Sequence, residues 1–137
     1  MFAKLTHAYR VWKSDRHESD KALAKNGRSG KWPTVRDTFL KTYPACSACG
    51  SREKMQVHHI KPFHLHPELE LDSKNFVGLC MSKEECHLML GHGGNFECFN
   101  PYILHDASQY LGASSLFRKT IKIQAKSLRF KNDGGAA

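Results

Sequence analysis

Two stretches decide the fold of this 137-residue chain, CSACGSREKMQVHHI (residues 46–60) and NFVGLCMSKEECHLMLGH (residues 75–92). Each contains one cysteine pair. Four thiolates around one tetrahedral Zn²⁺ make a closed structural site, and the binding free energy of that ion is also folding free energy. We therefore predict a structural zinc that ties the two stretches together; the alternative is buried thiols without a metal. The predicted zinc ligands are Cys46, Cys49, Cys80 and Cys86.

The same stretches predict a strand–loop–strand–helix order. MQVHHI (55–60) is short, rich in β-formers and closed by Pro62, and NFVGLC (75–80) predicts a second strand that begins at its asparagine. EECHLML (84–90) predicts a helix that ends at Gly91. Residues 63–74 predict a structured loop, either packed between the strands or serving as a further metal or substrate site. The fold class that follows is α+β.

The flanks predict helices and a tail. Residues 1–25 predict a basic helix, with Leu5, Ala8, Tyr9 and Trp12 at helical spacing. A second helix should start near Pro33 and end at Pro44, and another should start after Asn100. KNDGGAA (131–137) predicts a disordered tail. The expected organisation is a basic N-terminal helix and linker (1–32), a zinc-clamped core (33–101), and a C-terminal helix with a basic tail (102–137).

The charge distribution favours an anionic partner. The formal net charge is +8, and residues 1–45 hold ten Lys and Arg against four Asp and Glu. Residues 46–100 hold five against seven, and residues 101–137 hold six against two. Basic flanks around a middle rich in cysteine and histidine are suited to binding the phosphate backbone of a nucleic acid. The alternative is that these lysines and arginines simply keep the surface solvated. No apolar run is long enough for a membrane span or a signal peptide, so we expect a cytoplasmic protein.

The histidines carry the resemblance to a family. The texts CSACGS, VHHIKPF, HPELELD, NFVGLC, CHLMLGH and FNP stand in this order between residues 46 and 101. Paired histidines, then an asparagine, then a histidine, all inside a cysteine frame, resemble the HNH endonuclease family. The resemblance covers residues 33–101 and implies a ββα-metal (His-Me finger) core with flanking helices. It also implies metal-dependent hydrolysis of phosphodiester bonds in DNA, in a bacteriophage, prophage or restriction setting.

The resemblance also implies a role for each motif residue. His58 and His87 would be ligands of a catalytic divalent cation, with His92 as a third ligand or else a histidine at the helix end. His59 would be the general base and Asn75 would hold it in position. Adjacent strand residues point to opposite faces, which agrees with separate roles for His58 and His59. Relatives often carry Asp at the position of His58, and imidazole favours softer ions such as Mn²⁺, Ni²⁺ or Zn²⁺ over Mg²⁺.

Basic side chains are the expected contacts with double-stranded DNA. Sequence-independent, salt-sensitive affinity is typical of such arms. One active site cuts one strand, so a double-strand break needs a homodimer or two visits. We expect nicking with low sequence specificity. The residues assigned to DNA binding are Lys61, Arg10, Lys13, Arg28 and Lys31, with a second basic stretch at Arg118, Lys119, Lys122, Lys126 and Arg129.

Other functions remain as alternatives. A non-catalytic zinc-ribbon DNA-binding module explains the charge and the cysteines but leaves the histidines unexplained. An RNA-cutting or toxin-like nuclease on the same motif and a purely structural zinc protein are the remaining candidates. Cys98 has no assigned role.

Overall fold

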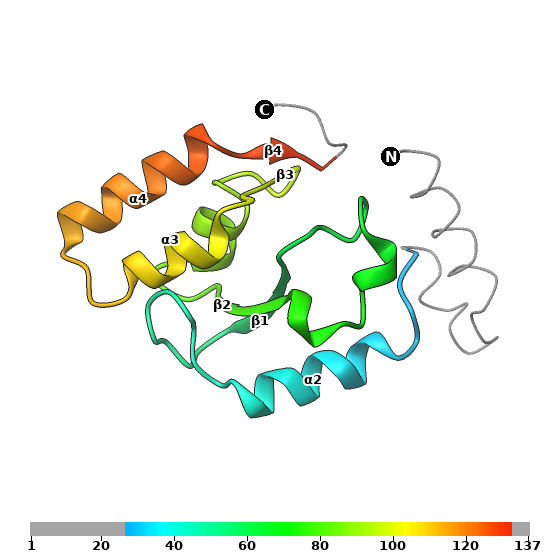
Figure 1. The fold of residues 1–137 in the computed structure, drawn as a ribbon. Coiled ribbons are helices and arrows are strands. Elements are labelled where there is room, and N and C mark those ends of the chain that lie inside the picture. Colours follow the sequence, from blue (N-terminus) through cyan, green and yellow to red (C-terminus); the bar gives the residue numbers. More distant parts are fainter. Residues whose placement is uncertain (1–26, 133–137) are drawn as a thin grey trace.

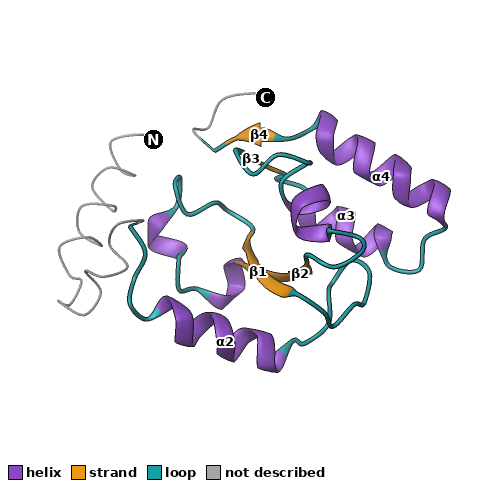
Figure 2. Ribbon diagram, turned by 180° about the vertical axis from the view of Figure 1, so that it is seen from behind, coloured by secondary structure: helices purple, strands orange, loops and turns teal. Residues whose placement is uncertain are grey.

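The computed structural model describes residues 27–132 of the chain. They form an α+β arrangement of helices and two small antiparallel sheets (Figures 1 and 2). The helix predicted over residues 1–25, with Arg10 and Lys13, lies outside the described residues.

The central sheet pairs β1 (Met55–His59) with β2 (Phe76–Cys80). The register sets Met55 opposite Cys80 and His59 opposite Phe76. Every residue of β2 is buried, because the strand is covered on both faces. Both predicted strands are confirmed, but β2 begins one residue later than predicted, since Asn75 completes a 3-10 turn (Ser73–Asn75).

Helix α2 (Trp32–Thr42) covers one side of this sheet (Figure 1). Pro33 stands in its first turn and Pro44 follows its end, as predicted. The rings of Trp32 and Phe39 meet the ring of Phe76 edge-on at centroid distances of 5.5 and 5.4 Å. These aromatic contacts bring the N-terminal side of the described chain against the end of β1 and the start of β2.

The helix predicted from Glu84 starts later and has a different geometry. Glu85 has a φ of 48°, which is left-handed and incompatible with a right-handed helix at that residue. The helix starts after this residue and is a single π-helical turn, His87–Gly91, which ends at Gly91 as predicted. The π-turn changes which side chains of this segment share a face.

The C-terminal part contains more structure than the sequence predicted. Helix α3 (Ile103–Tyr110) follows Pro101 as expected, but α4 (Ser115–Ser127) was not predicted as a separate helix. Helices α3 and α4 pack together and against the π-turn. The tail prediction was wrong for Lys131, because β4 (Phe130–Lys131) pairs with β3 (Cys98–Phe99). The buried core joins the sheet to these helices through Leu79, Leu90, Ile103, Tyr110, Ile121 and Ala125.

Candidate metal centres

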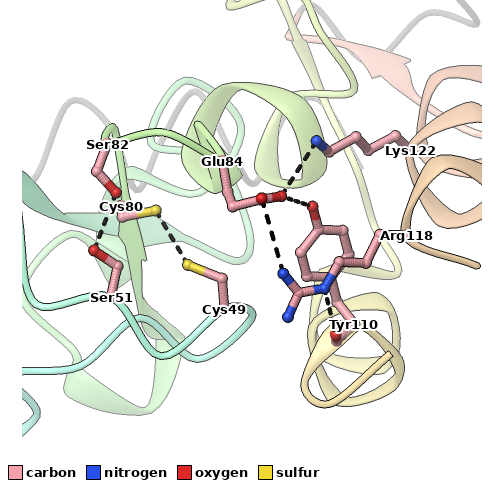
Figure 3. A network of polar contacts seen from close by, with 8 residues as sticks. All are labelled: Cys49, Ser51, Cys80, Ser82, Glu84, Tyr110, Arg118 and Lys122. Atoms are coloured by element: carbon pink, nitrogen blue, oxygen red, sulfur yellow. Dashed lines mark hydrogen bonds and ion pairs between the residues drawn. The ribbon is translucent and has the colours of Figure 1, made fainter. Parts of the chain in front are cut away.

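The four cysteines of the predicted pairs lie together, in a group of sulfur atoms that could hold a metal ion. Their Sγ atoms all lie within 4.8 Å of one another, and those of Cys49 and Cys80 are 3.5 Å apart (Figure 3). Around a tetrahedral zinc with Zn–S bonds of about 2.3 Å, sulfur atoms lie roughly 3.8 Å apart. The cluster thus fits Zn²⁺ with small side-chain adjustments. The five residues between Cys80 and Cys86 do not prevent this convergence.

Backbone hydrogen bonds shape the two cysteine loops. The N–H of Cys46 donates to the carbonyl of Ser51, and the N–H of Gly50 donates back to the carbonyl of Cys46. Gly50 has a φ of 80°, a left-handed conformation that glycine adopts without a Cβ penalty. The hydroxyls of Ser51 and Ser82 lie 3.0 Å apart and join the two loops (Figure 3).

The thiols of the cluster differ in their pKa values. The hydrogen bond from Cys86 lowers the pKa of Cys46 to about 4, and the same bond raises the pKa of Cys86. Burial raises the pKa of Cys49 to about 11. Without a cation, Cys49 and Cys86 therefore hold their protons at neutral pH, and metal binding must release them.

A second cluster consists of His58, His87 and His92. One ring nitrogen from each residue lies within 4.8 Å of the others. His58 comes from β1, and the two other histidines flank the π-turn. In Figure 1 the π-turn lies beside the β1–β2 sheet, which explains how residues 29 positions apart come together. The four-cysteine group and this three-histidine group are the two such groups found within residues 27–132.

The π-turn brings His92 to the same face as His87. On a continuous α-helix, a spacing of five residues places two side chains about 140° apart. A π-helical turn closes on i→i+5 hydrogen bonds instead, and the N–H of His92 donates to the carbonyl of His87 at 3.1 Å. The Nε2 atoms of the two rings consequently face each other at 3.1 Å.

Neighbouring acceptors fix the tautomers of these two rings. His92 stands at the end of the π-turn, and its Nδ1 donates to the carbonyl of Cys98 in β3 at 2.6 Å. Nδ1 of His87 lies 2.6 Å from the side-chain oxygen of Gln56. With protons on Nδ1, both Nε2 lone pairs point at each other, an arrangement that a cation would stabilise. Neither Gln56 nor the carbonyl of Cys98 was singled out from the sequence.

His58 completes this set of donors. It is 2% exposed, and its Nε2 is buried without a hydrogen-bond partner among residues 27–132. Burial, with smaller contributions from the neighbouring histidines, holds its pKa well below the ordinary value. Burial likewise lowers the pKa of His87 to about 3 and lowers that of His92. All three imidazoles are therefore neutral at pH 7, as metal ligation requires.

His59 is not part of the three-histidine group, in agreement with the separate roles predicted for His58 and His59. Its ring lies 4.7 Å from Trp32 and 5.2 Å from Phe76. Its Nε2 lies 2.9 Å from the carbonyl oxygen of Glu70, which can only accept, so Nε2 carries the proton and Nδ1 the lone pair. Burial lowers the pKa of His59 to about 4, against the raising effect of the Glu70 carbonyl.

A cavity of about 210 Å³ joins His59 to the histidine cluster. Arg28 is part of its wall, 4.6 Å above the ring of Phe63 and 5.2 Å from that of Trp32. The carboxylate of Glu70 holds this segment, accepting from the N–H of Ser29 and pairing with Arg28 at 3.7 Å. Glu70 therefore orients both His59, through its carbonyl, and Arg28, through its side chain.

The structure corrects the role predicted for Asn75. Its side chain does not bond His59; it accepts from the N–H of Lys61 at 2.8 Å and donates to the carbonyl of Lys61 at 3.0 Å. Asn75 is buried and ties the end of β1 to the start of β2. Any influence on His59 therefore passes through the backbone, and Glu70 makes the direct contact.

The loop over residues 63–74 is a packed element, and it provides no separate cluster of metal ligands within the described residues. Pro67 and Glu70 are buried in it. His64 lies at the cavity wall.

The predicted DNA-binding residues lie in different environments. Lys31 and Lys61 are exposed, whereas Arg28 faces the cavity. Arg118 and Lys122 of α4 instead approach the carboxylate of Glu84, which also accepts from the hydroxyl of Tyr110 (Figure 3). This network connects α3 and α4 to the loop between Cys80 and Cys86, and the Tyr110 hydrogen bond lowers the pKa of Glu84.

Comparison of the chain with protein-family models, with curated proteins and with solved structures finds no match. Among residues 27–132, none of the helices has both the length and the apolar character that crossing a bilayer requires.

Proposed function

We propose that the protein is a metal-dependent DNA endonuclease of the HNH type, in which β1, β2 and the His87–Gly91 turn form a ββα-metal core. The observation that carries the proposal is the set of three imidazole donors from His58, His87 and His92, beside a neutral His59 in the same cavity. A structural zinc module would need the cysteine cluster but would have no use for this second group of ligands.

The donor set fits a divalent cation. Two of the three histidines have Nδ1 committed to an oxygen acceptor, and the third has an unpaired buried Nε2 among the described residues. Three imidazoles suit Mn²⁺, Ni²⁺ or Zn²⁺ better than Mg²⁺. When bound, such an ion would supply charge stabilisation for a phosphodiester under attack and for its leaving oxygen.

His59 is suited to act as the general base. Its Nδ1 carries a lone pair and its ring is held by the Glu70 carbonyl, so Nδ1 can take a proton from a water molecule. The proton on Nε2 stays in its hydrogen bond while the imidazolium forms. A phosphodiester in the cavity would add a negative charge, which raises the pKa of a histidine toward neutral pH.

Arg28 is suited to hold the phosphate. Its guanidinium lies in the wall of the His59 cavity, so its positive charge is placed beside the proposed position of the phosphate. Glu70 pairs with the same guanidinium and limits its orientation. Lys31 and Lys61, both exposed, would add salt-sensitive affinity for the backbone of DNA.

The experiment compares nucleic-acid substrates with the zinc-loaded full chain, freed of other divalent ions. Supercoiled plasmid, linear duplex and a structured RNA are incubated with Mn²⁺, Ni²⁺ or Mg²⁺. We expect ion-dependent nicking of the plasmid, best with Mn²⁺ or Ni²⁺. Cutting of RNA alone would assign the site to an RNA nuclease, and binding of DNA without cutting under any ion would favour a zinc-ribbon DNA-binding module.

A further inference from the structure

A second, larger cavity adjoins the cavity of the histidines. It has a volume of about 650 Å³ and lies between the β3–β4 pair and the loop that follows β1. His64, Phe96 and Asn132 line both cavities, so the two lie side by side. Figure 1 shows β3 and β4 on the side of the π-turn away from α2. Most of the wall of this larger cavity therefore comes from residues outside the histidine and cysteine motifs.

The volume of this cavity is in the range that takes a ligand the size of a nucleotide. Binding sites for small molecules span about 300–1,000 Å³. A DNA duplex is too wide for such a space, whereas a single nucleotide turned out of its stack fits. A DNA strand bound at the neighbouring histidine cluster would therefore find room in this cavity for one unpaired nucleotide.

The lining of the cavity has the chemistry that recognises an unpaired nucleotide. The side chain of Phe96 is 51% exposed, and its ring lies 4.9 Å from the ring of His92. Exposed aromatic rings of this kind are stacking surfaces for bases. Arg129 and Lys131 add two cations to the wall, against one carboxylate from Glu97.

Two polar groups in the same wall have unused hydrogen-bonding capacity. Nη1 of Arg129 donates to the carbonyl of Gly93, but its Nε has no acceptor among residues 27–132. The side-chain nitrogen of Asn132 donates to the carbonyl of Phe96, but its Oδ1 has no donor in that range. Buried polar groups are normally paired, so this wall contains two polar atoms that the described residues leave unsatisfied.

We infer that this cavity is a subsite for one unpaired nucleotide of a DNA strand, next to the phosphodiester bound at the histidine cluster. The inference rests on the proposed nuclease function and narrows its substrate to single-stranded or distorted DNA. Phe96 stacks on the base, and Arg129 and Lys131 bind the adjoining phosphate. Among the basic residues of the C-terminal part, these two differ in position from Lys119 and Lys126, which are exposed and line neither cavity.

The test measures binding without cutting. Fluorescence anisotropy with a labelled single-stranded oligonucleotide and with its duplex is recorded with Mn²⁺ in a His59→Ala background. Phe96→Leu is compared with Phe117→Leu, an exposed phenylalanine on α4, and Lys131→Gln is compared with Lys126→Gln. We expect Phe96→Leu to weaken single-strand binding about fivefold or more and Lys131→Gln about threefold, with both controls within about twofold of the parent.

The outcomes separate this inference from the nuclease proposal. Equal effects of Phe96→Leu and Phe117→Leu, or equal affinity for single strand and duplex, would overturn the subsite even if the wild type cuts DNA. Selective loss of single-strand binding in Phe96→Leu and Lys131→Gln supports the subsite even if the wild type cuts nothing with any ion.

Discussion

The Nε2 atoms of His87 and His92 face each other at 3.1 Å, while the Nδ1 atom of each ring is bound to an oxygen. Two neutral imidazoles in these tautomers direct lone pairs at the same point. The pair is thus arranged as metal ligands are, with acceptors that hold each ring from behind.

Removal of one such acceptor should weaken the binding of the ion at the histidines. Gln56→Ala deletes the oxygen that holds Nδ1 of His87, and loss of a supporting hydrogen bond of this type costs about 10- to 100-fold in metal affinity. Isothermal titration with Mn²⁺ or Ni²⁺ on the zinc-loaded protein measures the change. Gln124→Ala, an exposed glutamine on α4, is the matched control. Equal affinities in the two variants would show that the Gln56 side chain does not support His87 as a ligand.

The two metal centres should be separable. Cys80→Ser should abolish the bound zinc and lower the thermal stability strongly, because the ion contributes folding free energy. Cys98→Ser changes the same chemical group at another buried position and should keep one zinc per chain. Elemental analysis and thermal unfolding give both quantities. Retention of zinc by Cys80→Ser would contradict the four-cysteine site.

Gly91 should be required for the position of His58. A Cβ at residue 91 would lie 2.9 Å from Nδ1 of His58 and 3.2 Å from Cδ1 of Leu79. Gly91→Ala should therefore displace the His58 ring and cost about 1–3 kcal/mol by overpacking, together with loss of ion binding at the histidines. Gly112→Ala is the control, since its φ of 77° makes an alanine strained while nothing lies within 4 Å. Titration calorimetry should show lost ion binding for Gly91→Ala alone.

Acid should destabilise the fold through His59. Its pKa in the fold is about 4, below the ordinary value of 6.5, so below pH 6.5 the unfolded chain takes up a proton that the fold refuses. The stabilisation is complete above pH 6.5 and is lost as the pH falls from there toward 4. Between pH 7 and 5, urea unfolding of the zinc-loaded protein should lose about 1–2 kcal/mol more than that of His59→Gln.

A matched variant isolates this effect. His105 is exposed on α3, and His105→Gln should follow the wild type across the same pH range. If His59→Gln and the wild type lose the same free energy of unfolding, then His59 does not resist protonation in the fold.

Much of the core arrangement is predictable from local patterns. The strands at residues 55–59 and 76–80 follow from β-forming residues between Pro and turn signals, and the convergence of the cysteines follows from their pairing. The different surroundings of His58 and His59 follow from the period of a strand.

Other features depend on tertiary structure. The π-turn that unites His87 with His92 looks like an α-helix in the sequence, since no local signal marks the left-handed Glu85 before it. The acceptor for His59 is a backbone carbonyl of Glu70, and carbonyls leave no trace in residue types. The pairing of Phe130–Lys131 with Cys98–Phe99 joins positions more than thirty residues apart.

The most direct test of the central claim is the rate of plasmid nicking by His59→Ala. The wild type, His59→Ala and His105→Ala are each supplied with zinc and then with Mn²⁺, and conversion of supercoiled to nicked plasmid is followed at excess enzyme. The account predicts that the wild type and His105→Ala nick at similar rates and only with the added ion, while His59→Ala is slower by about 100-fold or more. Equal rates for His59→Ala and the wild type would contradict it.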